Sequence, residues 1–158
     1  MAMDAAGNLY IAKAVSAGSS LNGVVKETST GGHYVESTVA GGRASPVSVA
    51  VYGAGNVYIA DQDSGLVTKM TLASGGDYLQ TQSFSGFGNP ESIAVDGSGN
   101  LYVGCTLFGL VKETLSGGTF TKSTMSSTVH AFGVTVDGDG NVYATEGNSA
   151  LYKFTPSG

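Results

Sequence analysis

Three oxygen-bearing side chains occur at alternate positions near the end of the chain, namely Asp137, Asp139 and Asn141. This spacing matches the start of a calcium-binding loop, in which alternate side-chain oxygens face the ion. The twelfth position of such a loop should carry a bidentate Glu, but it is Asn148 here, so an EF-hand is excluded. A tight hairpin turn, in which the first Asp bonds the backbone ahead of it, explains the same residues without a metal. We therefore expect no cofactor, and calcium at this turn is the alternative.

His130 is one of only two histidines, and it could act as a general base or a metal ligand. Together with Glu146 it is the catalytic pair to be expected if the protein is an enzyme. The alternative is a solvated loop histidine, since no second His stands near it in the pattern. The single cysteine, Cys105, has no partner for an internal disulfide, and no Cys/His spacing typical of zinc occurs. Its expected role is that of a small hydrophobic residue.

These groups lie within a repeated unit. The motif Gly-Asn-(Leu/Val)-Tyr occurs four times at intervals of about 40 to 50 residues, at Gly7–Tyr10, Gly55–Tyr58, Gly99–Tyr102 and Gly140–Tyr143. In the third copy we expect strands at 90–96, 100–104, 110–114 and 119–124, joined by Gly-rich turns. The first two strands are apolar and the last is rich in Thr, Lys and Ser, so the strands become more polar outward. This pattern predicts a four-stranded antiparallel meander packed between two others.

Radially stacked meanders of this kind are the blades of a β-propeller, so an all-β propeller with four blades is predicted. The expected blades are residues 1–43, 44–87, 88–129 and 130–158, and the last one lacks its outer strand. An isolated four-blade arc would expose two apolar faces. We therefore expect a homodimer that closes an eight-bladed ring, and a longer natural propeller as the source of the sequence. The four motif tyrosines should pack between blades.

The pattern Pro-x-x-(Ile/Val)-Ala-Val-Asp-x-x-Gly-Asn-(Leu/Val)-Tyr-(Ile/Val)-Ala-Asp resembles the NHL-repeat β-propellers over essentially the whole chain. The segment 140–146 also resembles the repeats of streptogramin-lyase propellers, although Tyr143 stands where those repeats usually carry Trp. The first resemblance implies the fold and is almost silent on activity. A non-catalytic scaffold or binding module is the main expectation, because no nucleophile–base pair, no convergent carboxylates and no His cluster emerge. The second resemblance implies a lyase or hydrolase, streptogramin-lyase-like or lactonase-like, with a metal or the His130/Glu146 pair in the central channel.

The loops of the two rims differ among the copies. One rim is nearly identical in all of them, whereas the other varies, and variable loops on a rigid scaffold are where binding usually occurs. The candidates for a ligand-binding rim are Arg43, Asp61, Glu91, Cys105, His130 and Glu146. Arg43 and Glu91 are expected at equivalent positions between blades, as a ligand clamp or as a surface pair of little energetic value. Asp61 is expected to bond loop backbone.

Charge excludes some partners. The formal net charge is −5 and the seven basic residues are scattered, so neither nucleic acid nor an anionic membrane is an expected partner. The expected partners are a second copy of the chain and a protein, peptide or glycan ligand. Low charge and abundant Ser, Thr and Gly favour an extracytoplasmic bacterial protein.

Overall fold

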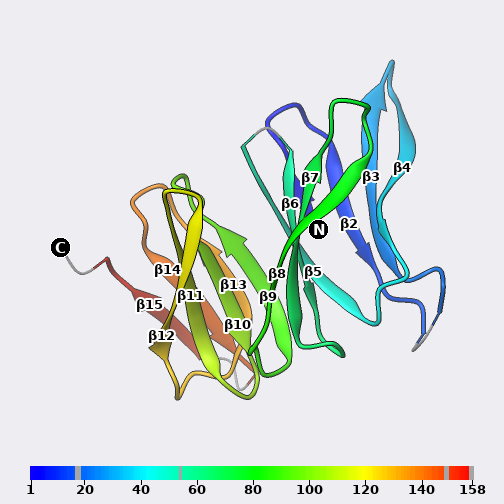
Figure 1. The fold of residues 1–158 in the computed structure, drawn as a ribbon. Helices are drawn as coiled ribbons and strands as arrows, with labels where there is room; N and C mark the ends of the chain where they lie inside the picture. The colour runs from blue at the N-terminus through cyan, green and yellow to red at the C-terminus, as the bar shows by residue number, and fades with distance from the viewer. Residues whose placement is uncertain (17–18, 54, 148–149, 157–158) are drawn as a thin grey trace.

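The structure is a computed structural model that describes residues 1–16, 19–53, 55–147 and 150–156. Within these residues, fifteen strands form four antiparallel sheets and there is no helix that could span a membrane. The sheets stand side by side along the chain, with the N-terminal and C-terminal sheets at opposite ends of the row (Figure 1). Each sheet has its strands in sequence order, as expected for a meander.

The four sheets match the four expected blades. Blade 1 consists of β1 (Ala2–Met3), β2 (Leu9–Lys13), β3 (Gly23–Thr30) and β4 (His33–Gly41). Blade 2 consists of β5 (Pro46–Tyr52), β6 (Asn56–Asp61), β7 (Leu66–Leu72) and β8 (Tyr78–Phe84). Blade 3 consists of β9 (Pro90–Val95), β10 (Leu101–Cys105), β11 (Gly109–Ser116) and β12 (Thr119–Ser126). Blade 4 consists of β13 (Ala131–Val136), β14 (Val142–Glu146) and β15 (Leu151–Phe154), and residues 157–158 lie outside the described part.

The hairpins form because an Asp and a Gly meet the needs of the turn between the first two strands. In blade 3, the backbone N–H of Gly99 donates to the Asp96 carbonyl at 3.0 Å, and Gly99 has a φ of 84°. Glycine reaches this left-handed conformation without the strain that a Cβ would add. Blade 2 departs from the pattern, since Tyr52 stands where the other blades have Asp.

Burial is greatest in the second strands of blades 2 and 3 and decreases from there outward, as the sequence predicts for the outer strands. Every residue of β10 is buried, whereas most of β12 is exposed. The first strands of successive blades pack against one another. They are also joined by hydrogen bonds, from Ile93 N to Ser48 Oγ (3.2 Å) and from Val134 N to Ser92 Oγ (3.1 Å). The first strands are therefore the innermost ones.

The apolar core is divided into three clusters, one between each pair of successive blades. We call the side of a blade that meets the next blade its forward face, and the side that meets the preceding blade its rear face. Tyr10, Tyr58 and Tyr102 lie on forward faces and are at most 3% exposed, which confirms their packing between blades. Tyr143 is half-buried, since no blade packs on the forward face of blade 4 among the described residues, so its packing between blades stays a prediction.

Candidate functional site

The variable rim is built where second strands end and first strands begin. Asp61 pairs with Pro46, Cys105 with Pro90 and Glu146 with Ala131. Each pairing is followed by a β-bulge that leaves one residue of the first strand without a partner. The bulged residues are Val47, Glu91 and Phe132. A bulge re-aims a side chain at the end of a strand, so this rim can present residues that the regular pleat would not.

Asp61 organises the loop between blades 1 and 2. Its side chain is 2% exposed, and its carboxylate accepts hydrogen bonds from Ala44 N (3.0 Å), Ser45 N (3.2 Å) and Ser64 N (3.1 Å). The prediction that Asp61 bonds loop backbone is confirmed. All three bonds go to the protein itself, so Asp61 positions the rim.

His130 and Glu146 are neighbours on the rim, but their side chains do not bond each other. Glu146 Oε1 accepts from the backbone N of His130 at 3.3 Å, and Glu146 Oε2 accepts from the Tyr152 hydroxyl at 3.1 Å. His130 Nδ1 is within hydrogen-bond distance of the Thr106 carbonyl oxygen. Because a carbonyl oxygen can only accept, Nδ1 donates in this contact, and in the neutral imidazole this leaves the lone pair on Nε2. The exposed imidazole therefore has the tautomer of a general base.

Arg43 lies against the rear face of blade 2. Its guanidinium donates to Thr68 Oγ1 (3.2 Å), Met70 Sδ (3.3 Å) and Gln80 Oε1 (3.3 Å). Burial lowers the pKa of Arg43, and the charge of Asp61 opposes that shift. Arg43 is thus a packing residue between blades 1 and 2.

The expected equivalence of Arg43 and Glu91 is wrong. Arg43 stands three residues before Pro46, and the residue three before Pro90 is Phe87. Glu91 instead occupies the bulge of β9 and bonds Gln62 Nε2 in the turn after β6. Blade 2 has the same bulge at Val47, which also directly follows the proline of its strand, so Val47 is the residue equivalent to Glu91.

Cys105 must also be reassigned. Its side chain is fully buried in the core between blades 2 and 3, so it is a core residue and does not line the rim surface. Burial raises the pKa of the Cys105 thiol to about 12. The thiol is therefore protonated and shielded, as in a small hydrophobic residue.

Asn22 is a rim residue that sequence comparison missed. It is 1% exposed, its Oδ1 accepts from Val15 N (2.8 Å), and its Nδ2 donates to the carbonyls of Ser16 and Ala44 (both 2.8 Å). It holds the long loop of blade 1 against the linker to blade 2. In the sequence, the one sign of this role is that Asn22 directly precedes an aliphatic strand. It lies in a long loop that has no counterpart in the other three repeats. Two residues of that loop, 17 and 18, lie outside the described part, as do 148 and 149.

The calcium candidates form a turn network. Asp137 Oδ1 accepts from Asp139 N (3.0 Å) and Asn141 N (2.9 Å), and Oδ2 accepts from Asn141 Nδ2 (2.8 Å) and the Tyr143 hydroxyl (3.1 Å). The hydrogen bond from the Asn141 side chain is the largest cause of the lowered pKa of Asp137. Asp4 and Asp96 make the same four bonds in loops that lack the second Asp. The turn alone therefore explains the Asp137 pattern.

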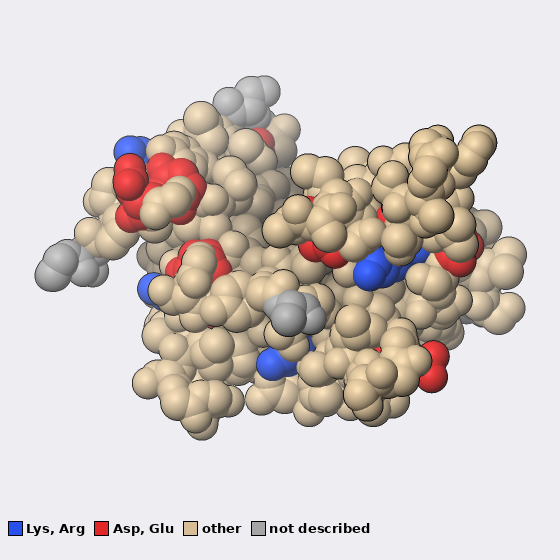
Figure 2. Space-filling model, turned by 90° about the horizontal axis from the view of Figure 1, so that it is seen from above, with Lys and Arg blue, Asp and Glu red and all other residues tan. Residues whose placement is uncertain are grey.

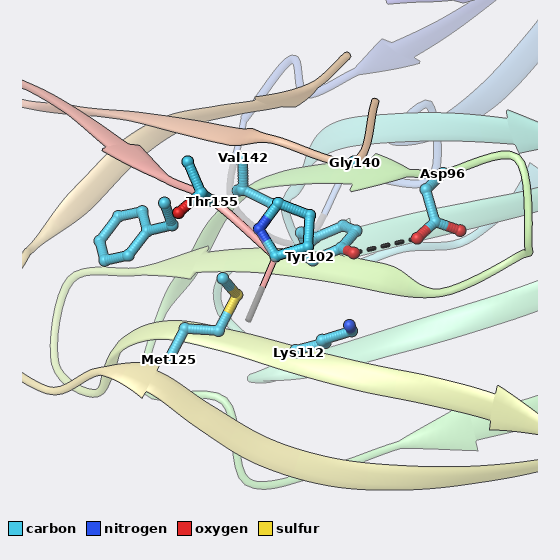
Figure 3. A pocket seen from close by; sticks show the side chains of 9 residues that line it. Asp96, Tyr102, Lys112, Met125, Gly140, Val142 and Thr155 are labelled. Carbon is cyan, nitrogen blue, oxygen red and sulfur yellow. Dashed lines mark hydrogen bonds between the residues drawn. The ribbon is translucent and has the colours of Figure 1, made fainter. Parts of the chain in front are cut away.

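A cavity of about 180 Å³ opens between blades 3 and 4 at the opposite rim. Asp96, Tyr102 and Lys112 line one side, and Phe154 and Pro156 from blade 4 line the other. Figure 3 shows the hydrogen bond from Tyr102 to Asp96 at its edge. A cavity of about 240 Å³ between blades 1 and 2 has the equivalent Asp4, Tyr10 and Lys26. In both cavities the Tyr hydroxyl donates to the Asp and the Lys lies over the Tyr ring, so the two cavities are repeats of one structural feature.

Charged side chains are sparse on the face seen from above, most of which is uncharged (Figure 2). Within the described residues, no group of three or more His, Cys, Asp or Glu side chains is placed to hold a metal ion. The rim therefore offers single polar groups, of which His130 has the geometry most suited to chemistry.

Comparison with family models finds no match, and neither does the search of curated proteins. Several solved structures match. One is assigned as a gluconolactonase, with a TM-score of 0.70, 15% identity, and coverage of 96% of this chain and 55% of that one. Another is a gluconolactonase from Xanthomonas campestris, with a TM-score of 0.58, 15% identity, and coverage of 84% and 52%.

A third match is virginiamycin B lyase from Staphylococcus aureus, with a TM-score of 0.60, 12% identity, and coverage of 97% of this chain and 53% of that one. The chain thus spans about half the length of the solved structures that it matches. At these identities the likeness concerns the fold, in which successive antiparallel meanders share apolar cores. The chain is a four-blade part of a β-propeller.

Proposed function

We propose that this chain is part of a small-molecule hydrolase of the lactonase type, with His130 as the general base at the variable rim. The contact between His130 Nδ1 and the Thr106 carbonyl carries the proposal, because it leaves Nε2 free to accept a proton. Two of the matched structures are described as gluconolactonases and another is a lyase, which supports a small-molecule enzyme over a scaffold.

In the proposed reaction, a water molecule gives a proton to His130 Nε2 as its oxygen attacks the lactone carbonyl. The ring C–O bond then breaks, and the departing alkoxide takes the proton from the imidazolium. Glu146 acts as a positioning residue, since it holds the backbone N–H of His130.

The test is hydrolysis of gluconolactone followed by pH-stat, with His130→Ala and Glu146→Gln compared with wild type. His33→Ala is the matched control, because His33 is the other histidine and is exposed in β4, after the hairpin turn. We expect His130→Ala to lower the rate at least 100-fold and His33→Ala to leave it unchanged. Absence of hydrolysis by wild type, or an equal loss in both histidine variants, would contradict the proposal.

A second candidate is a non-catalytic binding module for a protein, peptide or glycan. The rim contacts favour this candidate. The side chains of Asp61, Arg43 and Glu146 are engaged in hydrogen bonds within the protein, as structural residues are, and not held ready for catalysis. The NHL-like pattern of the repeats also supports it. If wild type hydrolyses no lactone, a glycan array and a peptide array probed with the labelled chain test this candidate directly.

A further inference from the structure

The forward face of blade 4 is built like the forward faces that are buried elsewhere in the chain. Val24, Val67 and Leu110 are 0% exposed, whereas Leu151, at the equivalent register in blade 4, is 67% exposed. Tyr143 is likewise half-buried where the other motif tyrosines are covered. The face has the residues of an interface but has no partner among the described residues.

The rear face of blade 1 shows the complementary situation. Leu9 and Ile11 are half-buried, whereas their equivalents in blade 2, Val57 and Ile59, are 0% exposed. Met3 is 67% exposed at the inner end of the same face. In blades 2, 3 and 4, this face is covered by the forward face of the preceding blade.

We propose that the forward face of blade 4 docks on the rear face of blade 1 of a second copy of this chain, and that two copies close one ring. The two free faces are the two halves of the interface that the chain already makes three times within itself. A contact between unlike faces that occurs twice closes around a two-fold axis. The inference rests on the fold and these side chains, and it does not depend on the proposed function.

Length favours a second copy in this arrangement. Because the chain spans 52–55% of three matched propellers, two copies supply the length of one such ring.

The test uses sedimentation equilibrium and light scattering of the full chain at micromolar concentration. We expect a mass of twice 15.9 kDa. Leu151→Glu blocks the forward face and Met3→Glu blocks the rear face, and both sites are exposed enough for the fold to tolerate the change. Each variant alone should be monomeric, because each junction of its ring would contain one blocked face.

Mixing the two variants provides the decisive measurement. The Met3→Glu chain keeps an intact forward face and the Leu151→Glu chain keeps an intact rear face, so together they should form a 1:1 pair through one junction. Leu79→Glu is the control, since Leu79 is 58% exposed on β8, away from both end faces, and this variant should remain a dimer. A monomeric wild type, a mixture that stays monomeric, or masses that grow beyond two copies would overturn the proposal.

Discussion

The ammonium nitrogen of Lys112 lies 5.4 Å from the ring centroid of Tyr102, whose hydroxyl donates to Asp96 at 2.9 Å. Lys112 and Tyr102 are directly paired across β10 and β11. The same Lys–Tyr pair recurs in every blade, with distances of 5.6, 5.9 and 5.5 Å in blades 1, 2 and 4. Each tyrosine in blades 1, 3 and 4 thus connects the hairpin turn to the third strand.

Replacing Lys112 by Met should lower the free energy of unfolding by about 0.5 to 1 kcal/mol. The change removes the cation from the face of the Tyr102 ring but keeps an unbranched apolar side chain of similar length. Urea denaturation followed by circular dichroism measures the loss. Lys112→Arg is the control, since it keeps a cation over the ring, and equal stability of the Met and Arg variants would contradict the role of the charge.

Asp96→Asn should destabilise the protein by about 1 to 2 kcal/mol at neutral pH, because an amide replaces a carboxylate that accepts four hydrogen bonds. Burial raises the pKa of Asp96, but the hydrogen bonds, first from Asn100, outweigh it and the pKa is lowered. A carboxylate with a lowered folded pKa stabilises the fold above its unfolded pKa, and that stability is lost as pH falls through the folded pKa. The variant should therefore lose less stability than wild type on acidification below about pH 4.

Asp139→Asn is the matched control for that experiment and also tests the calcium alternative. No side-chain hydrogen bond of Asp139 is found within the described residues, so the variant should keep wild-type stability within about 0.5 kcal/mol. Thermal melts with EDTA and with millimolar calcium should coincide for wild type and variant. If calcium raises the melting temperature of wild type and Asp139→Asn abolishes that rise, calcium binds at this turn.

Gly104→Ala should destabilise the protein by about 1 to 3 kcal/mol through overpacking. A Cβ at Gly104 would lie 2.7 Å from the Ala131 carbonyl oxygen and 2.9 Å from Val134 Cγ2, where blade 4 packs on blade 3. Gly97→Ala in the same blade is the control, because a Cβ there meets nothing within 4 Å. Thermal denaturation of the two variants compares them, and equal melting temperatures would show that β13 can move away.

Cys105 should resist thiol reagents in the folded protein. Its side chain is fully buried, and burial raises the pKa of its thiol to about 12, so the thiol stays protonated at pH 8. Reaction with DTNB at pH 8 should be slow without denaturant and complete within minutes in 6 M guanidinium chloride. Rapid reaction of the folded chain would show that the Cys105 thiol is accessible at the rim.

Several features of this chain follow from its sequence because they are local. The four Gly-Asn-(Leu/Val)-Tyr motifs predict four hairpins, since the Asp–Gly turn of Asp96 and Gly99 depends only on neighbouring residues. The increasing polarity from β10 to β12 predicts the order of burial. The role of Asp61 was also expected, because it stands where the NHL-like repeat pattern carries Asp, and its carboxylate accepts from loop N–H groups.

Features that depend on strand pairing or on contacts between blades were decided by the tertiary structure alone. The β-bulges at the starts of β5, β9 and β13 leave Val47, Glu91 and Phe132 unpaired, and no local signal in the sequence marks them. Tyr143 has the same motif as Tyr102 but differs in burial, because burial depends on whether another blade follows. The contact of His130 with Thr106 joins residues of different blades, so packing and not spacing sets its tautomer. The sequence thus determined the blade, and the tertiary structure decided which faces and which rim groups remain free.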